Sequence, residues 1–234
     1  MNVREETLLV VPGLGRDRLP LTIADCYGAL REVTVLPKPM TSPGFHHHAA
    51  HLKRFAGCHG AKKVIAESFG ASTVLHALST PSHPFTHAVL IAPFCFDQPR
   101  QDIAEHLSTL LEAANAGGSE AISEFLLDTL NLTDRRRASA RPWADETAEG
   151  LLRPGVSEVL AWLPFHCGVP SGHLDPTVRL LVIAQPGDHV HSLDVARRIA
   201  AASPRARLEI MPEPGGILLR TGALTGLISD FLAS

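Results

Sequence analysis

The segment 64–72 most constrains what this chain can fold into. A short apolar run ends in Ala66-Glu67-Ser68-Phe69-Gly70, and a helix-like segment, 69–78, follows at once. This layout is typical of a sharp strand-to-helix turn that lifts a serine hydroxyl clear of a sheet. Small residues are needed on both sides of the serine because neighbouring backbones come close there. The sequence therefore predicts a sheet with Ser68 exposed at the end of one strand.

The rest of the chain alternates short apolar runs with helix-length segments. Most of the runs are continuous Val, Ile and Leu stretches, as expected for parallel strands covered on both faces. This alternation predicts an α/β fold with a mostly parallel six-stranded sheet flanked by helices. The candidate strands are 7–11, 33–36, 63–66, 88–92, 179–184 and 207–211, and the candidate helices are 21–31, 47–56, 69–78, 192–202 and 224–232.

One connection breaks this rhythm. The segment 93–177 contains no good strand but has helical patterns at 103–114, 120–130 and 156–163. An insertion of this length is too long for a structureless loop in a compact domain. We therefore expect a core made of residues 1–92 and 178–234, with residues 93–177 forming a helical cap over the strand ends.

Composition excludes several classes of protein. The net charge of −3 gives no general drive toward nucleic acid or an anionic membrane. No apolar run approaches the ~20 residues that span a bilayer. The first residues are charged and lead straight into a strand, so no signal peptide is expected. The cysteines are widely spaced, which predicts reduced thiols in a cytoplasmic protein. No bound metal and no cofactor are expected. The cysteines are Cys26, Cys58, Cys95 and Cys167.

Five motifs in order resemble the α/β-hydrolase superfamily. Segment 8–15 resembles the first core strand and its Gly-rich loop, with Pro12 in place of the usual histidine. Segment 66–70 resembles the nucleophile elbow, and 86–92 the strand before the cap. Segment 181–190 resembles the strand and loop that carry the catalytic acid, and 208–216 the last strand and the turn before the catalytic histidine. The resemblance covers nearly the whole chain and implies the α/β-hydrolase fold.

The resemblance also implies roles for individual residues. Ser68 would be the nucleophile and Asp188 the acid, in the chain order of the family. The backbone N–H groups of Leu14 and Phe69 would form the oxyanion hole. Simpler structural roles remain open: Ser68 can be a helix N-cap, and Gly187-Asp188 is also turn chemistry.

The residue that should be the catalytic base is missing. After Gly215-Gly216, where the family places histidine, this chain has Ile217, and no histidine follows His191. A serine hydroxyl needs a base within hydrogen-bond reach to attack at neutral pH. Three accounts are open: a histidine from elsewhere replaces the base, the fold performs cyclisation, elimination or isomerisation with Asp188 or a stray histidine as the acid–base group, or the protein only binds a ligand. On the missing base alone, slow or absent hydrolysis of simple esters is expected.

Several histidines could replace the missing base. Our order of preference is His189, then the run 46–48, then His191, since all lie on loops at the catalytic end of the expected sheet. Side chains of adjacent residues such as Asp188 and His189 tend to diverge, however, and surface loop histidines are common. Within the first run, His47 and His51 have the i, i+4 spacing of a metal pair, but no Cys, Asp or Glu lies there to complete a site.

The expected substrate is a small or medium apolar carbonyl compound, and the reaction ester or thioester hydrolysis or a related acyl transfer. Candidate substrate-binding residues are Gly13, Glu67, Phe94, Phe96 and Trp162, although the aromatic ones can equally form the core of the cap. The basic run 134–137 with Arg141 is either a solvated loop or a phosphate patch for coenzyme A or a carrier-protein phosphopantetheine.

Overall fold

The protein was analysed as a computed structural model. It describes residues 7–16, 32–35, 44–80, 82–166, 168–169, 171–212, 217 and 221–234. The predicted helix 21–31, the turn at Gly215-Gly216, and Cys26 and Cys167 lie outside these residues.

Six parallel strands form one sheet, as the sequence predicts. Their order across the sheet is β2-β1-β3-β4-β5-β6, so the chain starts near the middle, moves to one edge and then crosses to the other. Each pairing is parallel and in register over four or five residues. The carboxyl ends of all six strands therefore lie on the same side of the sheet, where side chains from the loops that follow them can meet. The strands are β1 (Thr7–Val11), β2 (Glu32–Val35), β3 (Lys63–Glu67), β4 (His87–Ile91), β5 (Arg179–Ala184) and β6 (Ala206–Ile210).

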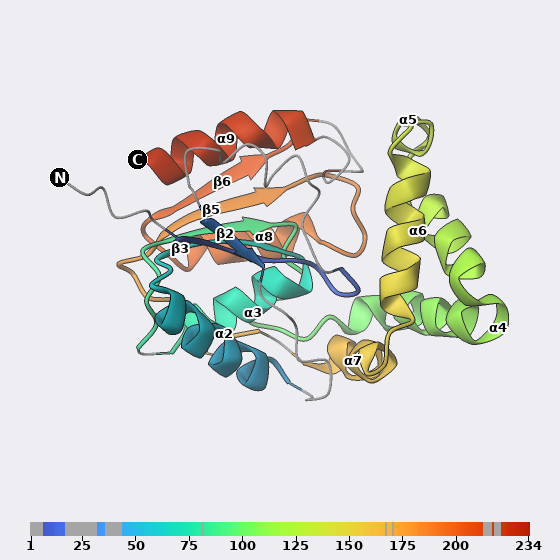
Figure 1. The fold of residues 1–234 in the computed structure, drawn as a ribbon, viewed down its shortest axis with the longest axis horizontal. Helices are drawn as coiled ribbons and strands as arrows, with labels where there is room; N and C mark the ends of the chain where they lie inside the picture. Colours follow the sequence, from blue (N-terminus) through green and yellow to red (C-terminus); the bar gives the residue numbers. More distant parts are fainter. Residues whose placement is uncertain are drawn as a thin grey trace.

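Helices cover both faces of the sheet (Figure 1). Alternate strand residues point to opposite faces, so Leu9 and Val11 join one core cluster, while Leu8 and Val10 join another. The first cluster is closed by α2 (Phe45–His59), α3 (Phe69–Leu78) and α8 (Leu193–Ala201). The second is closed by α9 (Thr221–Ala233). Burial on both faces explains why β1, β3, β4 and β5 read as largely continuous apolar runs, whereas β6 at the edge of the sheet is only partly buried.

The connection between β4 and β5 is helical where the structure describes it. It contains α4 (Ala104–Asp128), α5 (Leu132–Arg135), α6 (Ala140–Leu151) and α7 (Val156–Trp162), with short 3₁₀ turns at Gln101–Ile103 and Leu163–Phe165. Figure 1 shows these helices grouped beyond the end toward which the strands point. The two helical patterns predicted at 103–114 and 120–130 are parts of α4, which bends at Gly118 (φ 63°, ψ −146°).

Helices α5 and α6 were not expected from the sequence. The buried face of α6 is made mostly of small residues, Ala140, Ala144, Ala148 and Gly150, so it lacks the large apolar residues that reveal a helical period. Gly150 packs so tightly that a Cβ there would lie 1.4 Å from the carbonyl oxygen of Gly15. Helix α6 is thus pressed directly onto the loop that follows β1.

Among the described residues, no helix combines the length and apolar character needed to cross a membrane. The same residues contain no group of three or more His, Cys, Asp or Glu side chains arranged to hold a metal ion.

Candidate active site

Ser68 occupies a strained turn between β3 and α3. Its backbone has φ 51° and ψ −116°, a conformation that L-residues rarely adopt and that costs on the order of 1–3 kcal/mol. Two backbone hydrogen bonds hold the turn: the Ser68 amide donates to the carbonyl of Ile91 (2.9 Å), and the Ser72 amide donates to the carbonyl of Ser68 (3.1 Å). The strained elbow expected from the Ala-x-Ser-x-Gly pattern is therefore present.

Two glycines, one in the elbow and one in the loop after β1, allow this loop to lie very close to the elbow. A Cβ on Gly70 would stand 2.4 Å from the carbonyl oxygen of Val11 and 2.7 Å from that of Pro12. A Cβ on Gly13 would stand 2.7 Å from Glu67 Oε1 and 3.5 Å from Ser68 Cβ. The Gly-rich loop after β1 therefore lies directly against the serine, where the oxyanion loop was expected.

The hydroxyl of Ser68 has a histidine partner, and that partner is His191. Ser68 Oγ lies 2.8 Å from His191 Nε2, and His191 Nδ1 lies 3.0 Å from Asp188 Oδ2. The side chains of His191 and Asp188 are 21% and 17% exposed, so the chain of hydrogen bonds is largely shielded from water. Serine, histidine and carboxylate thus meet in the order that activates a nucleophile.

The charge of Asp188 determines where the protons lie along the hydrogen bonds between Asp188, His191 and Ser68. Burial alone would raise the pKa of Asp188, but the attraction of His191 and three hydrogen bonds, two from His191 and one from Gln185, outweigh it and lower the pKa to about 2. A carboxylate can only accept, so the Nδ1 of His191 must donate to it. In neutral His191 the Nε2 atom is then left as an acceptor for the Ser68 hydroxyl. Burial would lower the pKa of His191, yet the charge of Asp188 and its hydrogen bond raise it above the ordinary value.

A tight turn explains how Asp188 and His191 can pair. Asp188 Oδ1 accepts hydrogen bonds from the amides of Val190 (3.0 Å) and His191 (2.8 Å), so the carboxylate folds back over its own loop. Gly187 precedes it with φ 75°, a conformation suited to glycine. The second carboxylate oxygen accepts from Gln185 Nε2 (3.1 Å) and faces the His191 ring. Spacing of three residues therefore brings together two side chains that adjacent positions would not.

Arg100, which lies between β4 and α4, holds this turn in place through hydrogen bonds to backbone carbonyls. Its Nη1 donates to the carbonyls of Val190 (3.0 Å) and Phe94 (3.1 Å), and its Nη2 donates to the carbonyl of His189 (3.1 Å). The residue is only 4% exposed, and Asp102 balances its charge through bonds of 2.8–3.2 Å. The sequence carries no signal for this role of Arg100, because the two turn carbonyls that it binds lie 89 and 90 residues away along the chain.

The other candidate histidines do not reach Ser68, which corrects our order of preference. The described contacts of His189 run through its backbone, and its exposed side chain lies on the cavity wall. In the run 46–48, His46 and His47 are exposed, and His48 packs edge-on against Phe69 with ring centres 5.1 Å apart. The side chain next to Asp188 in sequence, that of His189, diverges from the Asp188 side chain, as the geometry of adjacent residues requires. The side chain three residues after Asp188, that of His191, faces the carboxylate.

Ile217 lies close to where the missing histidine was expected to act. It is 3% exposed, packs in the core cluster under α9, and lines the same cavity as Ser68, Asp188 and His191. An apolar wall therefore occupies this position, and the imidazole comes from the loop after β5 instead.

A cavity of about 640 Å³ opens above Ser68 and extends under the cap. Its polar end is formed by the loops after β1, β3 and β5, and the rest is largely apolar. The cap contributes most of the apolar wall, namely Phe94, Leu107, Leu110, Phe125, Leu126, Leu130, Trp143, Leu151, Leu160 and Leu163.

The predicted binding residues divide into two groups. Gly13, Leu14, Glu67, Phe69 and Phe94 line the cavity. The assignment of the other two aromatic residues needs correction, since neither Phe96 nor Trp162 lies on its wall. Phe96 is 1% exposed and belongs to the core on the α3 side of the sheet. The ring of Trp162 packs against Phe45 and Phe69 instead.

The basic run in the cap is largely paired with acidic side chains. Arg135 bonds Asp128 (2.5 Å), Arg137 bonds Asp134 (2.8 Å), and Arg141 bonds Glu124 (2.6 Å). Asp134 and Arg135 lie in α5, Arg136 and Arg137 in the turn that follows it, and Arg141 in α6. Paired guanidinium groups give little support to a phosphate patch.

Solved structures with the same architecture are α/β-hydrolases. An esterase from Exiguobacterium antarcticum (EaEST) superposes with a TM-score of 0.76 at 14% identity, covering 98% of this chain and 92% of that one. The esterase RhEst1 from Rhodococcus sp. ECU1013 gives 0.73 at 13% identity, with 100% and 92% covered. The meta-cleavage product hydrolase CumD from Pseudomonas fluorescens IP01 gives 0.70 at 15% identity, with 97% and 90% covered.

These similarities define the fold of the chain. It has the α/β-hydrolase fold, with the parallel sheet and flanking helices that the resemblance implied. No protein-family model matches the sequence, and no curated protein matches it either.

Proposed function

We propose that this protein is a serine-dependent hydrolase of carboxylic esters or thioesters. One observation carries the proposal: the continuous hydrogen-bonded chain from Ser68 Oγ through His191 to Asp188. It sits on a strained elbow at the mouth of a mostly apolar cavity. Two of the similar structures are esterases, and the activity of those proteins agrees with this chemistry.

The geometry supports a two-step acyl transfer. His191 Nε2 takes the proton of the Ser68 hydroxyl as Oγ bonds to the acyl carbon, and Asp188 stabilises the imidazolium that forms. His191 then protonates the departing alcohol or thiol. In the second step the same nitrogen takes a proton from water as the water oxygen bonds to the acyl carbon, and His191 returns this proton to Ser68 Oγ as the bond between Oγ and the acyl carbon breaks and the acid leaves. The backbone N–H groups of Phe69 and Leu14 are the proposed oxyanion hole, because both residues border Ser68 on the cavity wall.

In the non-hydrolytic alternative, Asp188 or a histidine from elsewhere in the chain would carry out the acid–base chemistry. A carboxylate with a pKa of about 2 is a very weak base at neutral pH, and both of its oxygens are engaged. A ligand-binding role without catalysis would not need the aligned Ser68–His191 pair. The aligned pair therefore favours hydrolysis over cyclisation, elimination, isomerisation or binding alone.

The shape of the cavity suggests the substrate class. A volume of about 640 Å³ with leucine and aromatic walls suits a small or medium apolar acyl or alcohol group. Coenzyme A or a carrier protein as the leaving group has weaker support, because the arginines of α5 and α6 are paired with carboxylates.

Covalent labelling of the nucleophile tests the proposal directly. A fluorophosphonate probe should label the wild-type protein at Ser68, and labelling should disappear in Ser68→Ala. Ser157→Ala removes an exposed serine on α7 and serves as the matched control, with labelling unchanged. The same three proteins should be assayed on p-nitrophenyl esters of two to eight carbons. Absence of both labelling and turnover in the wild type would overturn the proposal.

A further inference from the structure

A buried ion pair beside the nucleophile lacks hydrogen-bond partners. The side chains of Arg16 and Glu67 are 5% and 4% exposed, and Arg16 Nη1 lies 3.9 Å from Glu67 Oε1, too far for a hydrogen bond. Among the residues that the structure describes, Arg16 Nε and Nη1 and Glu67 Oε2 have no hydrogen-bond partner. Buried polar atoms are nearly always paired, so unpaired atoms on a cavity wall point to a ligand that completes them.

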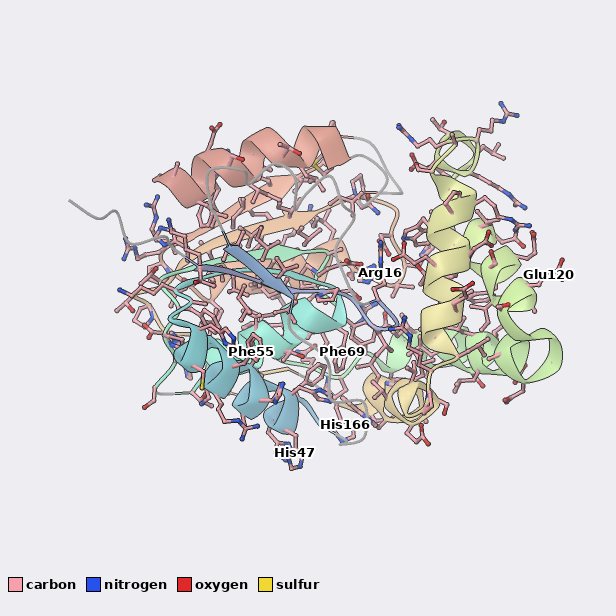
Figure 2. The ribbon with its side chains drawn as sticks, in the orientation of Figure 1. Arg16, His47, Phe55, Phe69, Glu120 and His166 are labelled. Atoms are coloured by element: carbon pink, nitrogen blue, oxygen red, sulfur yellow. The ribbon has the colours of Figure 1, made fainter. Side chains whose placement is uncertain are left out.

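The pair stands close to the reacting centre. Arg16 follows the Gly-rich loop, Glu67 directly precedes Ser68, and both line the cavity. A Cβ built on Gly13 would lie 2.7 Å from Glu67 Oε1 and 3.5 Å from Ser68 Cβ, so this carboxylate oxygen is close to the nucleophile. Figure 2 shows Arg16 at the end of the sheet that faces the cap. A group bound to this pair would therefore lie within a few bonds of the carbon that Ser68 attacks.

The charges of the pair decide which group fits. One guanidinium and one carboxylate cancel, so the subsite has no net charge to attract an ion. A carboxylate placed there would accept from Arg16 but would be repelled by Glu67 and, further off, by Asp188. A neutral group with an acceptor and a donor can accept from Arg16 and donate to Glu67 at the same time. A hydroxyl or a carboxamide has this chemistry.

We propose that Arg16 and Glu67 form a polar subsite that selects esters carrying a neutral hydroxyl or carboxamide on the acyl group, two or three bonds from the carbonyl. The acyl side is assigned because His191 protonates the leaving group, which must therefore face His191, while Arg16 and Glu67 lie on the side of the Gly-rich loop. This inference rests on the proposed hydrolase function and narrows its substrate class.

A matched series of four-carbon acyl esters tests the selectivity. The p-nitrophenyl esters of butyric acid, 3-hydroxybutyric acid and succinic acid (the monoester) share a four-carbon acyl chain. The butyryl chain is unsubstituted, the 3-hydroxybutyryl chain carries a hydroxyl on C3, and the succinyl chain ends in a carboxylate at C4. We expect kcat/KM for the 3-hydroxy ester to exceed that for butyrate by roughly 10- to 100-fold, since hydrogen bonds to charged groups are the strong ones. Equal values for these two esters, or a preference for succinate, would overturn the proposal.

Variants of the pair should weaken or abolish the preference. The double variant Arg16→Met/Glu67→Leu removes both charges together, which avoids leaving a single buried charge that could prevent folding. Glu67→Gln is the second, conservative variant. The double variant should make kcat/KM for the 3-hydroxy ester and for butyrate nearly equal, chiefly by lowering the value for the hydroxy ester. Glu67→Gln should lower the ratio of the two values only part of the way, because its amide oxygen still accepts a weaker hydrogen bond and Arg16 is retained. Arg54→Met, which changes an exposed arginine on α2, is the control and should keep the wild-type ratio. A double variant that keeps the ratio would contradict the proposal.

A binding measurement separates this inference from the hydrolase function. Ser68→Ala protein can be titrated by NMR with pentan-2-one and 4-hydroxypentan-2-one, ketones that match two of the acyl groups and cannot be hydrolysed. Tighter binding of the hydroxy ketone would support the subsite even if no ester were turned over. Equal binding would overturn the subsite while leaving the hydrolase function standing.

Discussion

Ser68 Oγ and His191 Nε2 lie 2.8 Å apart although 123 residues separate them in the chain. The imidazole comes from the loop after β5, which also carries Asp188, and not from the turn after β6, where Ile217 stands. Both partners of the serine therefore depend on one turn of four residues, and any movement of that turn displaces base and acid together.

The first prediction concerns the identity of the base. His191→Ala should reduce kcat/KM for the best ester by about 10⁴-fold or more, because loss of one member of such a triad removes the proton acceptor. His189→Ala should cause a much smaller loss, since its side chain contacts neither Ser68 nor Asp188 in the hydrogen-bonded chain. Steady-state kinetics on both variants decide between the two histidines. A larger loss in His189→Ala would reverse our assignment.

The second prediction concerns the pH profile. His191 must be neutral to accept the Ser68 proton, so kcat/KM should rise with pH and level off above the pKa of His191. Because Asp188 raises that pKa, the midpoint should lie above the ordinary histidine value of 6.5. Asp188→Asn removes the stabilising charge and should move the midpoint downward while lowering the plateau. A midpoint well below 6.5 in the wild type would argue against the Asp188–His191 pair.

The third prediction concerns Arg100 as a positioning residue. Arg100→Met removes the bonds to the carbonyls of His189 and Val190, and misplacement of a catalytic group by about 1 Å can cost ~10²-fold in rate. The loss should appear mainly in kcat. Since the Arg100 charge also lowers the pKa of His191, the midpoint of the pH profile should rise in Arg100→Met.

Arg100→Lys separates the two effects. It keeps the positive charge without the forked geometry, so kcat should fall while the pH midpoint stays close to that of the wild type. If Arg100→Met changed only the melting temperature and left kcat and the pH midpoint unaltered, Arg100 would have a purely structural role.

The fourth prediction concerns the close approach at the elbow. A methyl group on Gly70 would lie 2.4 Å from the carbonyl oxygen of Val11, so Gly70→Ala should destabilise the fold by about 1–3 kcal/mol or more. It should also displace Ser68 and lower activity. Urea unfolding gives the free energy of unfolding. Gly57→Ala on α2 is the matched control, because its added methyl meets no atom within 4 Å, and it should stabilise the protein by roughly 0.5–1 kcal/mol. Equal stability of the two variants would contradict the predicted crowding.

The sequence alone determined the sheet and the elbow. Runs of Val, Ile and Leu indicated six buried parallel strands, because continuous apolar segments are stable only where both faces are covered. The helix 69–78 and the strands at Thr7–Val11 and Arg179–Ala184 have the predicted bounds. The strained Ser68 was foreseeable because the small residues Ala66 and Gly70 are a local requirement of the turn itself.

Only the tertiary structure decided which residues complete the site. Whether His189 or His191 faces Ser68 depends on how the loop after β5 folds back onto the Asp188 carboxylate, and the buried Arg100 that holds it contacts backbone carbonyls, which carry no sequence signal. The prediction that Phe96 and Trp162 line the substrate cavity was wrong for a related reason. Hydrophobicity predicts that an aromatic ring is buried, but not whether it packs inside the protein core or on the wall of the cavity. Local steric and periodic constraints can be read along the chain, whereas contacts between distant segments exist only after the chain has packed.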